Sequence, residues 1–230
     1  MREDPFADGQ LPSAFPEVAP YPALRRLLAE QVDMQFSDIR VLLRLPQNNI
    51  APHIGCNFTA AAAIANQISG FSIWLFHTRY AQRLRRQETR RRDPLAGKRF
   101  HGFVRAYYPR VDGEPALGTL AKKLYQARNL LSHNLGISDL DRKPRRQEIL
   151  IVKPDPPMSA EDIVELELEA QFPGVGVPVR REGTTIRLSV PGLYWTLGRM
   201  LRAAVVDQPT RCEQEAERLL RRLPLPGTES

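Results

Sequence analysis

The chain has 230 residues, 42% of them hydrophobic and 26% charged, which is ordinary for a soluble globular protein of one large domain or two small ones. Lysine and arginine number 33 against 26 acidic residues, so the net charge is +7 and a polyanion is a candidate partner. The two cysteines, Cys56 and Cys212, lie far apart without metal-binding spacing, which excludes a disulfide framework and predicts a cytoplasmic protein.

The N-terminal segment has no apolar core after a basic start, so we do not expect a secretory signal. Four prolines fall within its first twenty residues, and we predict an irregular arm over 1–20. Helical periodicity begins at Pro22, a residue suited to the first turn of a helix. The apolar positions on one side of this helix are Leu24, Leu27, Leu28, Val32, Phe36, Ile39 and Leu43.

The uncharged segment 58–76 is nearly long enough to cross a bilayer. Asn66 and Gln67 interrupt its middle, and an amide pair exposed to lipid is costly. The sequence therefore favours a buried helix of an all-α core over a membrane span. We predict one long helix from about 58 to 92, apolar in its first half and strongly basic in its second.

A shorter helix is expected over about 95–108, and a longer one begins near Leu117 after a loop that contains proline and glycine. The apolar residues of the longer helix follow steps of three and four, so one side of it should pack on the core. Gly136 can end this helix. The apolar stripe consists of Leu117, Leu120, Leu124, Ala127, Leu131 and Leu135.

The hydrophobic period then changes, and four segments resemble strands. They are 147–153, 164–170, 177–181 and 184–190, with a hairpin turn at Glu182–Gly183. Glutamates of the second segment could face arginines of the last two as cross-strand partners. These residues are Glu165, Glu167 and Glu169, opposite Arg180, Arg181 and Arg187.

The second of these segments has an alternative interpretation, because Ser159 and Asp162 have the spacing of a helix cap and could start a helical turn. Helices return after Pro191, over 193–206 and 210–223. We predict a mainly α protein, a single domain over 1–230, built as a helical bundle. A small antiparallel β insert over 147–190 precedes its C-terminal helices.

Polar residues cluster near the end of the helix that begins at Leu117, in the segment "RNLLSH" (128–133). Asn129 and His133 are four residues apart and share one face, and Arg128 and Ser132 form the neighbouring pair. Arg128 and His133 diverge by about 140° around the helix axis. Histidine suits the proton transfers of RNA cleavage, and arginine stays charged and grips phosphate. Asparagine could orient the imidazole or bind phosphate.

The segment supplies one histidine, whereas cleavage by a 2′-hydroxyl uses both a base and an acid. A symmetric dimer that places two copies of this helix side by side would supply two histidines and two arginines. We therefore expect a homodimer with the site at its interface. Arg128 would then work with His133 of its own chain or with the partner subunit's His133.

The segment "RNLLSH" resembles the R-(N/D/H)-x3-H form of the R-x4-6-H motif of HEPN domains. Its context, "FHGFVRAYYPRVDG" and then "LAKKLYQARNLLSHNLG", is similar to a bacterial subgroup in which a Y-x-P helix end precedes an LY-x-x-RN-x-x-x-H helix. The resemblance covers about 58–137 and implies an all-α bundle. For catalytic members it implies metal-independent endoribonuclease activity at a dimer interface. Carried over residue by residue, Arg128 and His133 would be catalytic and Asn129 would support them.

The basic run 83–92 is the best candidate for contacts to an RNA backbone, and a solvated helix end is an equal alternative. His101, in a helix with Arg99 and Arg105, could also face a polyanion. No histidines or carboxylates have convincing metal spacing, so we expect neither a metal nor a cofactor. The candidate RNA-binding residues are Arg83, Arg85, Arg86, Arg90, Arg91 and Ser132.

Two functions follow from these residues. The first is a HEPN-type endoribonuclease in phage defence or a toxin system, with RNA as substrate and a neutralising antitoxin or other protein as a further partner. The second is a catalytically inactive HEPN-like module that binds RNA or protein. The divergence of Arg128 and His133 and the β insert motivate the second hypothesis.

Overall fold

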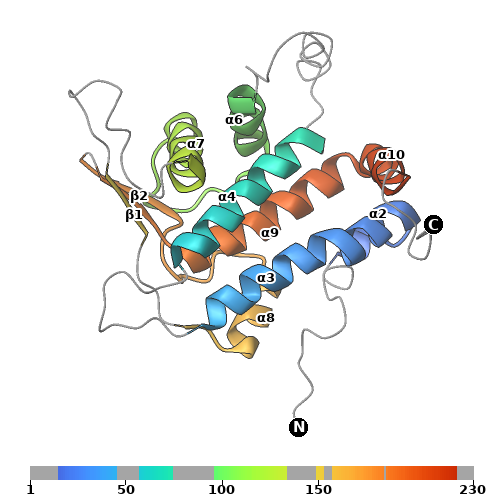
Figure 1. The fold of residues 1–230 in the computed structure, drawn as a ribbon, viewed down its shortest axis with the longest axis horizontal. Helices are drawn as coiled ribbons and strands as arrows, with labels where there is room; N and C mark the ends of the chain where they lie inside the picture. Colours follow the sequence, from blue (N-terminus) through green and yellow to red (C-terminus); the bar gives the residue numbers. More distant parts are fainter. Residues whose placement is uncertain are drawn as a thin grey trace.

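The computed structural model describes residues 15–45, 57–74, 96–133, 149–152, 157–183 and 185–221. The described chain is mainly α-helical, with a small sheet before the last two helices, as the sequence predicts (Figure 1). The helices are η1 (Pro16–Val18), α2 (Pro22–Leu27), η2 (Leu28–Val32), α3 (Asp33–Arg44), α4 (Asn57–Trp74), α6 (Ala96–Tyr107), α7 (Leu117–His133), α8 (Ala160–Leu168), α9 (Val190–Asp207) and α10 (Pro209–Leu220). The strands are β1 (Ile149–Val152), β2 (Val179–Glu182) and β3 (Thr185–Leu188).

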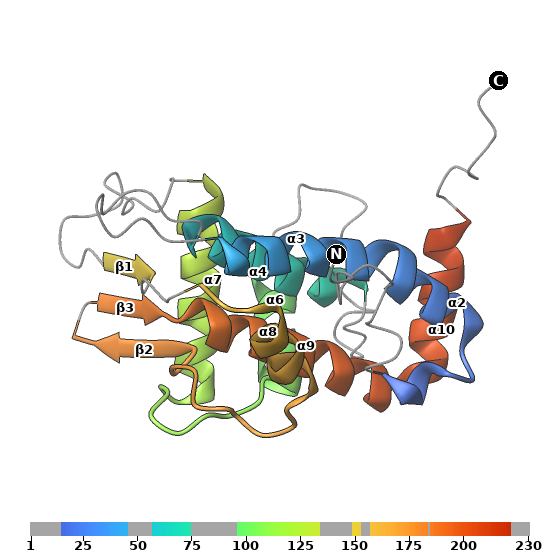
Figure 2. The ribbon, with the colours of Figure 1, turned by 90° about the horizontal axis from the view of Figure 1, so that it is seen from below.

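Two long helices, α4 and α9, pack against each other through the middle of the bundle (Figure 1). On one side α3 packs on α4, and on the other side α6 and α7 cross them steeply. At one end of the bundle α10 pairs with α2, and the three-stranded sheet lies at the opposite end, near α7 (Figure 2). The pair α6–α7 therefore forms a layer with one inner side and one outer side.

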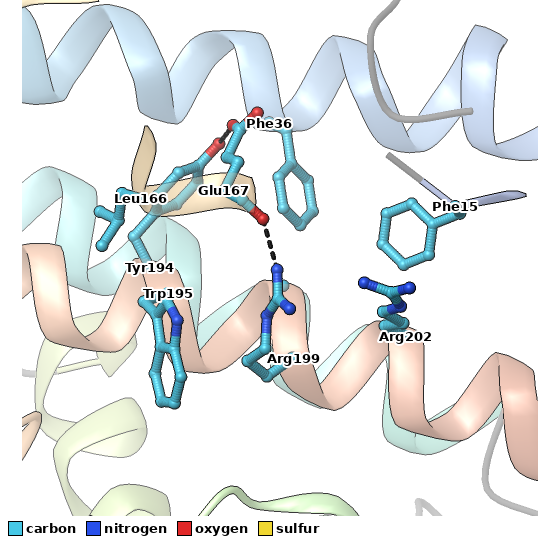
Figure 3. Close-up of a pocket in the computed structure, with 9 residues that line it drawn as sticks. Phe15, Phe36, Leu166, Glu167, Tyr194, Trp195, Arg199 and Arg202 are labelled. Carbon is cyan, nitrogen blue, oxygen red and sulfur yellow. Dashed lines mark hydrogen bonds between the residues drawn. The ribbon is translucent and has the colours of Figure 1, made fainter. Parts of the chain in front are cut away.

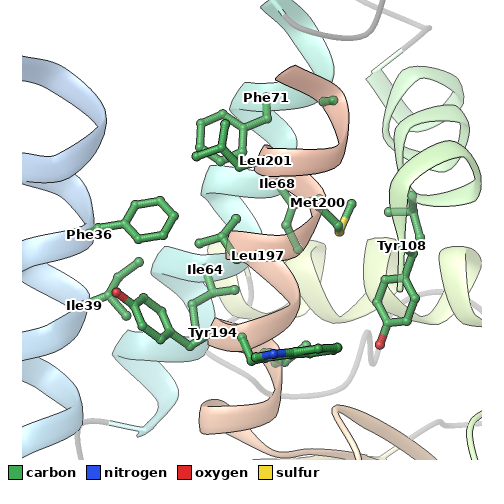
Figure 4. Close-up of a cluster of buried hydrophobic side chains, with 14 of the residues drawn as sticks. Phe36, Ile39, Ile64, Ile68, Phe71, Tyr108, Tyr194, Leu197, Met200 and Leu201 are labelled. Carbon is green, nitrogen blue, oxygen red and sulfur yellow. The ribbon is translucent and has the colours of Figure 1, made fainter. Parts of the chain in front are cut away.

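The core lies where α3, α4 and α9 meet, and large apolar side chains from all three fill it (Figure 4). Phe36 from α3, Ile64 from α4 and Leu197 from α9 are essentially inaccessible to solvent. Because α4 contacts α3, α6, α7 and α9, its apolar sequence is explained by burial, as expected. No helix that the structure describes has both the length and the apolarity needed to cross a membrane.

The segment from Pro22 to Arg44 forms one helical run, in which the five π-helical residues of η2 join α2 to α3. Every apolar position predicted for this run is buried. Of the predicted arm over 1–20, the structure describes residues 15–20, and there Phe15 and Val18 are buried against the bundle. A hydrogen bond from Arg202 on α9 to Glu17 also holds η1 against the bundle.

The sheet differs from the predicted antiparallel insert in one respect. Strands β2 and β3 form the predicted antiparallel hairpin, with Gly183 at φ +59° in the turn. Strand β1, however, pairs in parallel with β3, in the order β1-β3-β2, so the sheet is mixed. A parallel pair needs a crossover connection, and the chain between β1 and β3 includes α8 and β2.

The predicted strand over 164–170 is wrong, because this segment belongs to helix α8 up to Leu168. The Ser159 hydroxyl accepts from the Asp162 N–H at 3.0 Å, and Asp162 accepts from the Ser159 N–H at 3.0 Å. This capping box confirms the alternative interpretation of the sequence. The predicted glutamate–arginine ladder is therefore absent from the described sheet, where Glu182 pairs with Arg187 at 2.9 Å instead.

Candidate functional site

Helices α6 and α7 run antiparallel, as contacts at their two glycines show. A Cβ atom on Gly97, near the start of α6, would lie 3.2 Å from the Tyr125 ring in the later part of α7. A Cβ atom on Gly118, in the first turn of α7, would lie 3.4 Å from the Arg105 guanidinium near the end of α6. Residues 97, 101 and 105, each one turn apart, therefore face α7 from its later part back to its start.

The inner side of this pair is apolar, as the stripe in the sequence predicts. In α7 the buried residues are Leu120, Ala121, Leu124 and Ala127, and in α6 they include Phe100, Phe103 and Val104. Arg99 of α6 is buried as well, and the exposed cations Lys98, Arg105 and Lys122 lie on the outer side. We call this outer side the α6–α7 face, and its residues are Lys98, His101, Arg105, Lys122, Arg128 and Asn129.

The predicted motif lies in the last turns of α7. Arg128 and Asn129 are half-buried, and the Arg128 Nη1 donates a hydrogen bond to the Asn129 Oδ1 at 3.2 Å. This bond joins two of the three predicted catalytic residues and restricts the guanidinium. His133 is the last residue of α7, one turn after Asn129. The side chains of Ser132 and His133, and the whole of Arg83, Arg85, Arg86, Arg90 and Arg91, lie outside the described residues.

His101 is packed between the two helices. Its ring meets the Tyr125 ring edge-on, with centroids 5.2 Å apart, and Tyr125 also packs on Phe100 at 5.3 Å. The His101 Nε2 atom is buried and has no hydrogen-bond partner among the described residues. Burial, and then the nearby charges of Arg105 and Lys122, lower the pKa of His101. At neutral pH the imidazole is therefore uncharged among cations.

The charges of these two helices have one sign. Together α6 and α7 carry six lysines and arginines and no aspartate or glutamate. Lys98, Arg105 and Lys122 are exposed. Two carboxylates beside the end of α6 are already engaged by tyrosines of that region: Asp207 accepts from Tyr107 at 2.8 Å, and Glu114 accepts from Tyr108. A surface of this kind attracts polyanions.

A second polar cluster, which sequence reasoning missed, lies where α3, α8 and α9 meet, away from α6 and α7 (Figure 1). Figure 3 shows three of its residues, Glu167, Tyr194 and Arg199. Arg40 of α3 is 1% exposed and donates from Nη1 to Asp33 at 2.9 Å and from Nε to Glu167 at 2.8 Å. Glu167 of α8 also accepts from the Tyr194 hydroxyl, and its backbone carbonyl accepts from Arg199. We call these residues the Arg40 cluster, and it joins α3, α8 and α9.

The Arg40 cluster borders a cavity of about 20 Å³, which has room for about one water molecule. The cluster is therefore a structural joint, with no space for a substrate. Burial alone would lower the pKa of Arg40, but Tyr194, Glu167 and Asp33 raise it above its ordinary value. The sequence held one signal for it, since Arg40 falls on the apolar stripe between Phe36 and Leu43.

No group of three or more histidines, cysteines or carboxylates lies close enough to hold a metal within the described ranges. Comparisons of the chain with protein-family models, with curated proteins and with solved structures found no match. The function must therefore be argued from the α6–α7 face itself.

Proposed function

We propose that the protein is a metal-independent endoribonuclease of the HEPN type that acts by 2′-hydroxyl attack at a homodimer interface. The observation that carries this proposal is the position of Arg128, Asn129 and His133 in the last turns of α7, on a pair of helices without an acidic residue. A phosphodiester could approach these residues without meeting a carboxylate of either helix. A dimer through this end of α7 would bring two copies of the motif together.

In this mechanism each residue has one task. One His133 takes the proton of the 2′-hydroxyl, whose oxygen attacks the phosphorus, and the partner subunit's His133 gives a proton to the departing 5′-oxygen. The products are a 2′,3′-cyclic phosphate and a 5′-hydroxyl. Arg128 stabilises the charge of the pentacovalent phosphorane, and the hydrogen bond to Asn129 orients its guanidinium. Arg83, Arg85, Arg86, Arg90, Arg91 and Ser132 would contact the RNA backbone.

A second function is favoured by one specific observation. The half-buried Arg128 is bonded to its neighbour Asn129, and α7 remains helical through His133, so Arg128 and His133 leave the helix about 140° apart. Such residues could hold the end of the helix without taking part in chemistry. The protein would then be a catalytically inactive module that binds RNA through the same cationic helices.

Cleavage of a mixed-sequence RNA pool in EDTA separates these two functions. We expect wild type to leave 2′,3′-cyclic phosphate ends, and His133→Ala and Arg128→Ala to lower the rate by roughly 10²-fold or more, because each removes a transition-state interaction. Gln126→Ala, an exposed neutral substitution on the same helix, is the matched control and should cleave normally. Cleavage that survives His133→Ala would refute the mechanism, and RNA binding without any cleavage would establish the second function.

A further inference from the structure

We propose that Arg105 and Lys122 form a phosphate-binding subsite that guides an RNA strand along the α6–α7 face toward Arg128. This inference rests on the RNA-directed function proposed above and adds a substrate track that is separate from the basic run 83–92. The track consists only of residues that the structure describes.

Helices α6 and α7 bring cations to one spot of the α6–α7 face. The Arg105 guanidinium reaches the first turn of α7, where its Nη2 lies 3.4 Å from the Cβ position of Gly118. Lys122 is one turn further along α7, and the charges of Arg105 and Lys122 both act on His101. Two exposed cations, one from each helix, therefore lie near the same imidazole. Only the antiparallel packing of α6 and α7 brings them together.

Neither Arg105 nor Lys122 forms an ion pair with any residue in the part of the chain that the structure describes. Three exposed arginines elsewhere do form such pairs: Arg26 with Glu30 at 2.8 Å, Arg187 with Glu182 at 2.9 Å, and Arg218 with Glu215 at 2.7 Å. Like charges placed together repel each other, and a bound phosphate would relieve that repulsion.

The Arg105 guanidinium and Lys122 lie along α7, before the proposed catalytic residues. Lys122 and Asn129 are seven residues apart, or two turns on one side of α7. Arg128 starts about 100° further round the helix, and its guanidinium reaches the Asn129 side chain by the hydrogen bond described above. From Gly118 to His133 the helix rises about 22 Å, which is long enough for several consecutive phosphates. Because Gly118 has no side chain, the Arg105 guanidinium can lie directly over the first turn of α7, at the start of the track.

RNA binding by a paired set of charge variants tests the track. The probe is a labelled 20-nucleotide single-stranded RNA of mixed sequence, measured by fluorescence anisotropy in EDTA, with His133→Ala in every protein so that the probe stays intact. The test variant is Arg105→Ala with Lys122→Ala. The matched control is Arg26→Ala with Arg187→Ala, which removes the same charge from two other exposed surfaces.

We expect the test variant to lose roughly tenfold or more in affinity at about 150 mM salt, and its log–log salt slope to fall by about 1.4, because two contacts to single-stranded phosphates are lost. The control should change affinity less than about twofold, with an unchanged salt slope. Equal losses in both variants, which would indicate net charge alone, overturn the proposal, as does wild-type affinity in the test variant. Absence of RNA binding in the His133→Ala parent also overturns it.

The failure of the track can be distinguished from the failure of the nuclease. If the protein with His133 intact cleaves RNA while Arg105→Ala with Lys122→Ala binds normally, the track is wrong and the nuclease stands. If no cleavage occurs but the double variant loses affinity selectively, the track stands and the nuclease is wrong. Equal thermal unfolding midpoints for the proteins under comparison show that a loss of affinity is a surface effect.

Discussion

The α6–α7 face and the Arg40 cluster both contain several charged residues, but they differ in how these charges are paired. In the Arg40 cluster cations are bonded to carboxylates, whereas the charges of the α6–α7 face are cations alone. Helix α8 carries Glu161, Asp162, Glu165 and Glu167 without a lysine or arginine, and its inward glutamate is bonded to a buried arginine of another helix. The charged residues of α6 and α7 are all lysines and arginines. Of these, Arg105 and Lys122 face solvent without an ion pair among the described residues. Matched charge inside the bundle fixes the fold, and unmatched charge on its surface is available for a ligand.

The largest effect is expected when the buried cation of the Arg40 cluster is removed. Arg40→Met leaves Asp33 and Glu167 without their buried cation, so we expect a loss of about 3–5 kcal/mol in the free energy of unfolding, measured by urea denaturation. Arg26→Met, which removes an exposed pair with Glu30, is the control and should leave the free energy of unfolding nearly unchanged. Similar costs for the two variants would show that the Arg40 cluster does not join the helices.

A smaller effect is expected where α8 begins. Ser159→Ala removes the hydroxyl that caps the Asp162 N–H, so the free energy of unfolding should fall by about 1 kcal/mol. Ser159→Asp keeps an oxygen acceptor at the cap and serves as the control, with little change expected. If alanine and aspartate behave alike in the same denaturation experiment, the cap does not hold α8.

The smallest effect is expected at His101, near the unpaired cations of the α6–α7 face, and it concerns how stability depends on pH. Burial, and then Arg105 on α6 and Lys122 on α7, hold the pKa of His101 below 6.5, so the folded protein binds fewer protons than the unfolded chain as pH falls below that value. Wild type should therefore lose stability relative to His101→Gln between about pH 7 and pH 5, as measured by denaturation at each pH. Adding Arg105→Ala should reduce this difference. A stability difference between wild type and His101→Gln that does not change with pH would show that folding does not lower the pKa of His101.

The sequence was informative where burial follows a local period. The stripe of Leu120, Leu124 and Ala127 defined both α7 and its inner side, and thereby placed Asn129 on the opposite side. Arg128 is half-buried at the border of the stripe, two turns after the buried Ala121. Composition likewise favoured a buried α4 over a membrane span, because the amides in its middle are costly in lipid. Local patterns of this kind need no knowledge of distant residues.

The remaining features depend on contacts between distant segments. The alternation of glutamate with leucine or valine over 164–169 imitates a strand, but the capping box starts a helix that buries Ile163 and Leu166 three residues apart. Glu167, one of the two carboxylate partners of Arg40, lies 127 residues away, so no local pattern could reveal it. The grouping of Arg105 with Lys122 likewise requires the antiparallel packing of two helices, and the parallel pairing of β1 depends on a strand more than thirty residues later.

The span between Arg40 and Glu167 also has a consequence for the order in which the chain folds. During synthesis Arg40 emerges with Asp33, seven residues away on the same helix, long before Glu167 and Tyr194 exist. Asp33 can partly neutralise Arg40 before α8 and α9 have been synthesised. Because contacts between distant residues form slowly, we expect the docking of α8 to be among the last steps of folding. The ion pair between Arg40 and Glu167 then forms when the C-terminal part of the chain docks on α3.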